Sequence, residues 1–267
     1  MPWLALTLEV ERAAAEAFSD ALLEAGAQSV SLDGDGTVVA ILSMAEDSNA
    51  LIGAAARAAG IAAPRFSSER LDDRDWVRAS QAQFVAFAIG ARLWVGPSWH
   101  EPPPGRIAVR IDPGLAFGTG THPSTKLILG YLERTIRGGE RVLDYGCGSG
   151  ILAIAAARLG AAHVDCVDLD PDALDTAAAN ARANGVRLNA MLPDALPAAV
   201  YDIVVSNILA QPLIVLAPLL AERGTRIALS GILEGQADEV LRAYAPRFRM
   251  RVSDVEEGWA LLEGARR

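Results

Sequence analysis

Three glycines at alternate positions, Gly146, Gly148 and Gly150, follow a short apolar run and precede an alanine-rich segment. A strand that ends in a glycine turn and continues into a helix brings its backbone close to a nucleotide-like ligand. The dinucleotide fingerprint G-x-G-x-x-G places its third glycine one residue later than this chain does. The shortened turn therefore favours a ligand with one ribose and no pyrophosphate, such as S-adenosylmethionine.

Polar residues are expected at the ends of the strands that neighbour this turn. Asp168 follows the next apolar run, 163–167, and a carboxylate at that place can accept hydrogen bonds from both ribose hydroxyls. Asp194 and Asn207 follow the two strands predicted after it. Because ligand-facing residues of an open α/β sheet come from the carboxyl ends of its strands, we expect one shared site. The side-chain oxygen of Asn207 can also orient an attacking amine, although an Asn at a strand end is often only a helix cap.

A stretch rich in glycine and threonine, 112–125, lies one helix before the glycine turn. Pro123 fits the first turn of that helix, so residues 121–125 are expected to present free N–H groups to a carboxylate such as that of a methionine moiety. We interpret the stretch as an active-site flap. His122 is the nearest candidate for a general base, but a loop histidine is more often structural, and we assign no base.

Apolar side chains near this site are expected to help an amine lose its proton, because burial disfavours the ammonium form. Leu115, Phe117 and Ile208 are the candidates for such apolar walls.

The order of predicted elements divides the chain into three parts. Residues 1–63 follow a β-α-β-β-α pattern, which a last strand near 64–67 would complete as a small α+β, ferredoxin-like domain. Residues 64–105 are assigned to a linker region, since they combine a charged segment with the stiff Pro-rich break at 101–105. Within this region the apolar stretch 84–95 can add strands or a hairpin. Residues 106–267 alternate strands and helices and predict an α/β, Rossmann-like, seven-stranded domain.

Charge and composition limit the possible partners. The chain of 267 residues has a formal net charge of -9, which argues against nucleic acid as a direct partner. Residues 1–63 carry nine carboxylates and two arginines, so this module suits a basic partner, although the charge can also serve solubility alone. No apolar run is long enough to span a membrane. The N-terminus lacks the pattern of a secretory signal, which predicts a cytoplasmic protein, and we expect a monomer.

Two cysteines, Cys147 and Cys166, are interpreted as reduced packing residues, as expected in a reducing compartment. Together with three scattered histidines they do not form the spacing of a metal site, and no metal is expected.

Several stretches resemble the bacterial ribosomal protein L-eleven methyltransferase family. The most specific are DPGLAFGTGTHPST at 112–125 and SNILAQPL at 206–213, and VLDYGCGSGILAIAA at 142–156 marks the broader class of S-adenosylmethionine-dependent methyltransferases. Residues 75–84 and 92–99 resemble the connecting segment of that family. The motif match runs from about residue 74 to the end, whereas the first 63 residues agree in architecture more than in motif.

This resemblance implies an enzyme that uses S-adenosylmethionine to trimethylate lysine ε-amino and N-terminal α-amino groups of large-subunit ribosomal protein L-eleven. It also implies that the small N-terminal domain binds this protein substrate. The family's cofactor contacts carry over to Thr125, Gly146, Asp168 and Asn207. The wider class adds Asp194 as the expected partner of the adenine amino group. The family usually has threonine where this chain has Ser124, and since both carry a hydroxyl we expect little change.

Three other interpretations stay open on the sequence. One is a methyltransferase of the same fold that acts on another protein lysine or on a small molecule, which has no evident need for an acidic N-terminal module. Another is a nicotinamide-dependent oxidoreductase, against which the position of the third glycine counts. The last is a non-enzymatic protein that senses the cofactor, against which the stretch 112–125 argues.

Overall fold

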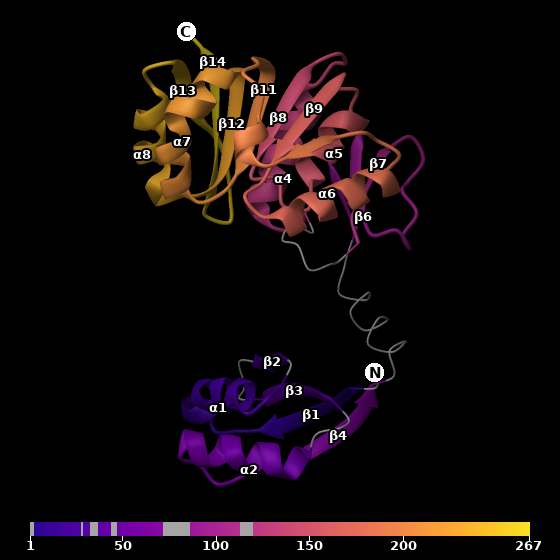
Figure 1. Cartoon of the computed structure of the whole chain (residues 1–267), viewed down its shortest axis with the longest axis vertical. Coiled ribbons are helices and arrows are strands. Elements are labelled where there is room, and N and C mark those ends of the chain that lie inside the picture. The colour runs from indigo at the N-terminus through magenta and orange to yellow at the C-terminus, as the bar shows by residue number, and fades with distance from the viewer. Residues whose placement is uncertain (1–2, 28, 33–36, 44–46, 72–85, 113–119) are drawn as a thin grey trace. The chain divides into compact units, whose positions relative to one another are not determined.

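The computed structural model describes residues 3–27, 29–32, 37–43, 47–71, 86–112 and 120–267 of the chain. They belong to two compact units, Met1–Gln83 and Phe84–Arg267. Figure 1 shows the elements of both units along the chain.

The first unit is a small β-α-β-β-α-β sandwich. Its four strands form an antiparallel sheet in the order β2-β3-β1-β4. Alternate side chains of the two central strands, among them Leu6, Leu8 and Ala40, are buried against Phe18 and Ile52 of the two helices. This element order and strand order confirm the predicted ferredoxin-like α+β fold. The elements are β1 (Trp3–Glu9), α1 (Arg12–Glu24), β2 (Ser29–Leu32), β3 (Thr37–Ser43), α2 (Ser48–Ala59) and β4 (Phe66–Leu71).

The second unit is built on a seven-stranded sheet in the order β10-β9-β8-β11-β12-β14-β13. The first five strands of this order are parallel and doubly wound, whereas β14 inserts antiparallel between β12 and β13. The predicted Rossmann-like seven-stranded domain is therefore confirmed. Its elements are α4 (Pro123–Thr135), β8 (Arg141–Tyr145), α5 (Ile151–Arg158), β9 (His163–Val167), α6 (Pro171–Ala183), β10 (Asn189–Met191), η1 (Pro193–Ala195), β11 (Tyr201–Asn207), α7 (Ala210–Arg223), β12 (Gly224–Leu233), η2 (Glu234–Gln236), α8 (Ala237–Tyr244), β13 (Phe248–Glu256) and β14 (Trp259–Arg266).

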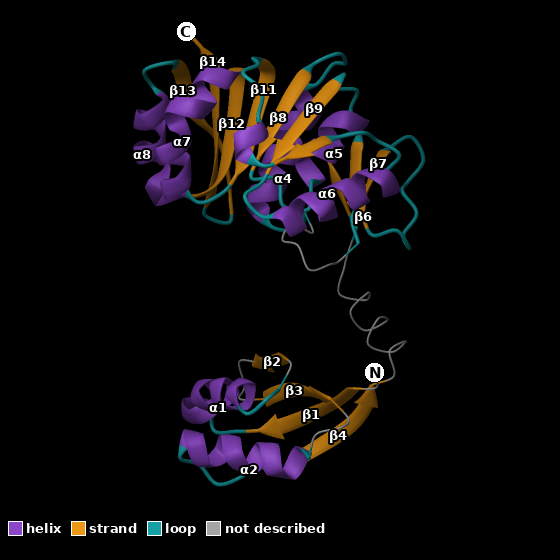
Figure 2. Cartoon of the chain, viewed as in Figure 1, coloured by secondary structure: helices purple, strands orange, loops and turns teal. Residues whose placement is uncertain are grey.

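Helices cover both faces of this sheet, as Figure 2 shows. Successive strand residues point to opposite faces, so Val142 packs in one buried cluster and Leu143 in the other. The first cluster joins the sheet to α4, α5 and α6, and the second joins it to α7 and α8. Burial on both faces explains why apolar residues follow one another directly in β8 (Val142 and Leu143) and in β11 (Ile203, Val204 and Val205).

A separate three-stranded sheet precedes α4. It consists of β5 (Phe87–Ile89), β6 (Leu93–Gly96) and β7 (Ile107–Arg110), with β6 in the middle. Strands β5 and β6 lie inside the range 64–105 that was assigned to a linker, as does β4 of the first unit, whereas β7 begins just after it. Short strands that pair only within their own unit have little periodicity to distinguish them from a connection.

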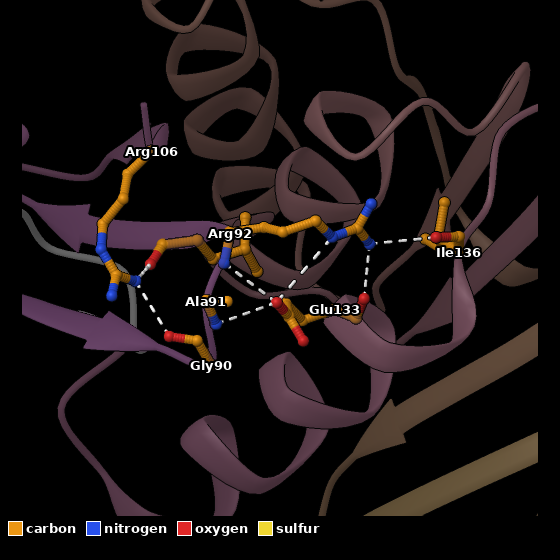
Figure 3. A network of polar contacts seen from close by, with 7 residues as sticks. Gly90, Ala91, Arg92, Arg106, Glu133 and Ile136 are labelled. Atoms are coloured by element: carbon orange, nitrogen blue, oxygen red, sulfur yellow. Dashed lines mark hydrogen bonds and ion pairs between the residues drawn. The ribbon is translucent and has the colours of Figure 1, made fainter. Parts of the chain in front are cut away.

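The small sheet is fastened to α4 by the polar network of Figure 3. One carboxylate oxygen of Glu133 accepts the backbone N–H groups of Ala91 (3.1 Å) and Arg92 (3.0 Å) in the turn between β5 and β6. The guanidinium of Arg92 donates in return to the carbonyl oxygens of Glu133 and Ile136. Arg106 closes the same turn by donating to the carbonyl oxygen of Gly90 (3.0 Å). These contacts hold the helix whose first turn faces the candidate site.

Candidate active site at the carboxyl edge of the large sheet

The glycine turn lies between the carboxyl ends of β8 and β11, where the strand order of the sheet reverses. Gly146, Gly148 and Gly150 have φ of 81°, 50° and 77°, in the left-handed region that disfavours side chains. A Cβ atom on Gly146 would lie 2.5 Å from Cγ2 of Ile208, so a side chain does not fit there. The turn therefore presents bare backbone at the crevice where ligands of such sheets bind.

Asp168 follows β9 and is tied to this turn. Its Oδ2 accepts the backbone N–H of Gly148 at 2.8 Å, and its Oδ1 accepts that of Asp170 at 3.1 Å. A carboxylate oxygen has two acceptor positions, so each oxygen retains one after these bonds. Asp168 is half-buried and can therefore accept two hydroxyl groups of a ligand while staying fixed to the turn.

Asn207 ends β11 and contacts the first turn of α4. Its Nδ2 donates to Oγ1 of Thr125 at 3.0 Å, and Thr125 is only 4% exposed. In this bond the amide nitrogen is the donor and the Thr125 hydroxyl oxygen is the acceptor, which anchors the amide to α4. Among the residues that the structure describes, no hydrogen bond occupies the side-chain oxygen of Asn207, which is the atom available to an incoming donor.

Asp194 lies in η1, directly after β10, and is exposed. Since β10, β9, β8 and β11 are neighbouring parallel strands, the structure places Asp194, Asp168, Gly146 and Asn207 along one edge of the sheet, in that order. Thr125 joins them through its bond to Asn207. All five residues proposed from the sequence thus come to the same edge.

Asp144, two residues before the glycine turn, was not selected from the sequence. It is fully buried, its Oδ2 accepts the backbone N–H of Ala153 at 3.1 Å, and its Oδ1 has no hydrogen bond among the described residues. Burial raises the pKa of Asp144 to about 7; the Ala153 bond opposes this and the charge of Asp168 adds to it. In the sequence, the signal for Asp144 is an acidic residue that directly follows the apolar Val142 and Leu143 within a predicted strand.

Three exposed leucines at this edge were not predicted from the sequence. Leu169, Leu192 and Leu209 follow β9, β10 and β11 and are 81%, 40% and 68% exposed. Large apolar side chains left in water beside a row of polar strand ends are typical of a surface that a ligand or partner covers. Their sequence signal is an apolar residue one or two positions past the end of a strand.

His122 caps the first turn of α4. The expectation that residues 121–125 present free N–H groups is therefore wrong for Ser124 and Thr125, whose N–H groups donate to His122. His122 is the N-cap of α4, and its Nδ1 accepts the backbone N–H of Ser124 (3.3 Å) and lies 2.7 Å from the Ser124 hydroxyl. Its ring packs edge-on against Trp259 of β14, with 4.6 Å between centroids. The flap residues Leu115 and Phe117 lie outside the described residues. Ile208, the third candidate wall, is half-buried against Gly146.

Cys147 and Cys166 are buried and free of disulfides. Contact with the Cys166 thiol and burial both raise the pKa of Cys147, so it stays a neutral thiol. Among the described residues, no three side chains of metal-binding type gather in one place. In the same part of the chain, every helix is too short or too polar to cross a bilayer.

The fold and this edge define the class of the protein. A mostly parallel seven-stranded sheet with a glycine turn and polar strand ends at its reversal point is a Rossmann-like methyltransferase domain. The chain belongs to the ribosomal protein L11 methyltransferase (PrmA) family, whose model matches residues 2–267. The family inferred from the motifs is confirmed, and the match extends into the first 63 residues, where motifs were weak.

Individual relatives agree with this assignment. The chain is 43% identical to the ribosomal protein L11 methyltransferase of Chromobacterium violaceum, over 100% of this chain and 99% of that protein. It is 46% identical to the protein of the same name from Thiobacillus denitrificans, over 100% of both. The crystal structure of ribosomal protein L11 methylase from Lactobacillus delbrueckii subsp. bulgaricus is 32% identical, with a TM-score of 0.62 over 68% of this chain and 98% of that chain.

A more distant neighbour shares the fold alone. The 16S rRNA N2 G1207 methyltransferase (RsmC) of T. thermophilus, solved in complex with AdoMet and guanosine, is 19% identical with a TM-score of 0.50, over 90% of this chain and 58% of that chain. The family assignment favours methyl transfer over the oxidoreductase and cofactor-sensing alternatives.

Proposed function

We propose that the protein transfers methyl groups from S-adenosylmethionine to lysine ε-amino and N-terminal α-amino groups of ribosomal protein L11, up to trimethylation. The observation that carries this proposal is Asp168, which is bonded to the glycine turn through Gly148 and, among the residues that the structure describes, keeps one acceptor position on each oxygen. A fixed carboxylate beside bare backbone suits the two ribose hydroxyls of an adenosine.

The remaining residues of the edge fit the rest of this cofactor. Exposed Asp194 can accept from an adenine amino group, and the exposed Leu169 and Leu192 at the same sheet edge offer apolar surface for the ring. Thr125 lies in the first turn of α4, where the positive end of the helix dipole favours the carboxylate of the methionine moiety. When bound, the cofactor supplies an activated methyl group on a sulfonium.

The chain itself must deliver a neutral amine in line with that methyl group. A lysine with pKa about 10.4 is about 3.4 units from neutrality at pH 7, which costs about 5 kcal/mol; an α-amine with pKa about 8 costs about 1.4 kcal/mol. Apolar side chains such as Ile208 lower this cost by disfavouring the ammonium. The free side-chain oxygen of Asn207 orients the nitrogen by accepting one of its N–H groups, while its bond to Thr125 keeps the amide from turning.

We propose that the first unit recognises the protein substrate. Residues 1–63 carry nine carboxylates against two arginines, which complements a lysine-rich ribosomal protein and steers its approach. The acidic charge belongs to a unit whose described residues contain no histidine or cysteine for catalysis.

A mass measurement tests the proposed function. The full-length protein is incubated with S-adenosylmethionine and purified ribosomal protein L11, and the intact mass of the substrate is followed, with peptide mapping of the modified amines. We expect successive additions of methyl groups on lysine and N-terminal amines. Methylation of other ribosomal proteins but not of this one would support the alternative acceptor, and no methylation at all would refute the proposal.

A further inference from the structure

A basic cavity lies at the edge of the large sheet opposite to the glycine turn. It has a volume of about 510 Å³ and is formed by the end of α4, the beginnings of β12 and β13, and the end of β14. Because β12 is parallel to β11 and β8, its beginning lies at the amino edge of the sheet, away from Gly146 and Asn207. The arginines that line this cavity, called the arginine cavity below, are Arg134, Arg137, Arg226, Arg249 and Arg251.

Composition does not explain this concentration. Residues 84–267 contain 18 lysines and arginines and 20 carboxylates, yet five of these basic residues and only one carboxylate, Glu263, line the arginine cavity. Five like charges at one place repel one another, which costs stability unless something compensates. A bound anion would compensate this repulsion, so the cluster indicates an anion-binding site.

The single carboxylate neutralises only part of the cluster. Glu263 pairs with Arg134, and its Oε2 lies 3.3 Å from Nη2 of Arg251. Among the described residues, no ion pair engages Arg137, Arg226 or Arg249. Arg226 is half-buried and donates only to the carbonyl oxygen of Asp202, at 3.4 Å, whereas Arg137 and Arg249 are exposed. The charge of Arg226 also interacts with the Glu140 carboxylate, so among the described residues Arg137 and Arg249 are the guanidinium groups left to bind an anion.

Guanidinium groups select phosphate among common anions. Their planar arrangement of N–H donors matches two phosphate oxygens at once, and they are the usual choice for nucleic-acid backbones. Several of them around one cavity fit a chain of phosphates better than a single ion. The proposed substrate is a ribosomal protein, a class of protein that itself binds RNA, so RNA is the polyanion to test.

We propose that the arginine cavity binds the phosphodiester backbone of RNA. The local charge at this edge overrides the expectation, based on the net charge of -9, that the protein has no nucleic-acid partner. The choice of RNA as the polyanion rests on the proposed function, because the substrate is a ribosomal protein. The cavity lies on the methyltransferase unit, so RNA bound there leaves the carboxyl edge open for the cofactor and the amine.

RNA binding by the full-length protein tests this proposal. Fluorescence anisotropy with a labelled single-stranded RNA is measured over a range of salt concentrations, without cofactor or protein substrate. The double variant Arg137→Gln/Arg249→Gln removes two exposed guanidinium groups that make no ion pair in the described residues. The matched control Arg182→Gln/Arg187→Gln removes the same charge from two exposed arginines outside the cavity.

We expect the cavity variant to bind RNA at least tenfold more weakly than the wild type, and the control to bind within about twofold of it. The slope of log affinity against log salt should fall by roughly 1.4 in the cavity variant, since each lost phosphate contact contributes about 0.7 for a single strand. Circular dichroism verifies that both variants are folded. Arg251→Gln serves as a second cavity variant and should also weaken binding.

Two results would overturn the proposal. Equal binding by the cavity variant and the control would place any RNA contact elsewhere. Competition by inorganic phosphate or by poly-glutamate as effective as competition by unlabelled RNA, at equal anion concentration, would show a general anion site. Because no methyl transfer is measured, either result is separate from a failure of the proposed function, which the mass measurement reports.

Discussion

The buried carboxyl of Asp144 makes the stability of the methyltransferase unit depend on pH in an unusual direction. Its pKa is raised to about 7 in the fold, against about 3.9 for an unfolded Asp. Between these values the folded state holds the proton and the unfolded state has released it. The stability from this group is therefore fully present below about pH 4 and is lost as pH rises through about 7.

The expected magnitude follows from the difference in pKa. About three units at 1.36 kcal/mol each give about 4 kcal/mol between pH 4 and pH 8. For a unit of this size, 1 kcal/mol shifts the melting temperature by about 2–4 °C, so the effect corresponds to about 8–16 °C. Asp144→Asn has nearly the same shape and does not titrate. The melting temperature of the wild type minus that of Asp144→Asn should therefore fall by about 8–16 °C between about pH 4 and pH 8.

Differential scanning calorimetry of the second unit's transition at several pH values measures this difference. Asp165→Asn is the matched control, since Asp165 is also buried, on the neighbouring strand β9, and its pKa shifts the other way. Burial alone would raise the pKa of Asp165, but hydrogen bonds from Tyr201, Asn189 and His163 outweigh burial and lower it. The stability that Asp165 contributes is present above about pH 4 and lost in acid, so its variant should deviate most at neutral pH. A difference between wild type and Asp144→Asn that stays constant within about 2 °C would refute the reasoning.

Three further outcomes are expected at the carboxyl edge and in the first unit. Asp168→Ala should weaken S-adenosylmethionine binding by roughly 10- to 150-fold in calorimetry, since a hydrogen bond to a charged group is worth about 1.5–3 kcal/mol. The control Asp170→Ala removes only a helix cap and should leave the affinity unchanged. Unchanged affinity in Asp168→Ala would contradict the ribose assignment. Asn207→Ala should lower kcat about tenfold, the value of one ordinary hydrogen bond, and lower cofactor affinity less; equal losses would make Asn207 a binding residue only. Deletion of Met1–Gln83 should preserve cofactor binding and abolish methylation of the protein substrate, and retained activity would exclude the first unit from recognition.

The sequence predicted the parts of this protein that depend on local patterns. Alternation of apolar strands with helices specified the doubly wound sheet, and glycines at 146, 148 and 150 marked its turn because only their backbone reaches the required φ. The carboxyl-edge rule then placed Asp168 and Asn207 without any knowledge of contacts.

Other features depend on packing that no local pattern encodes. Whether Asp144 is buried without a second partner, or Leu169 exposed, is decided by neighbours on other strands. The bond from Asn207 to Thr125 joins residues 82 positions apart, and only the docking of α4 brings them together. Strands β5 and β6, which lie within the range assigned to the linker, depend in the same way on pairing within a small sheet that Glu133 fastens to α4.

The arginine cavity shows how a single topological step changes a functional expectation. The return of the chain through β13 and β14 places Arg249 and Arg251 on the same sheet as Arg226, one strand away across β14, although a helix separates these strands in sequence. A net charge summed along the chain cannot record this, since it weighs an exposed carboxylate of the first unit equally with an unpaired guanidinium of the second. The electrostatic field that a polyanion meets falls off within about 8–10 Å at ordinary salt, so the local cluster governs binding there. The same sheet thereby keeps two chemistries apart, with carboxylates and bare backbone at its carboxyl edge and guanidinium groups at its amino edge.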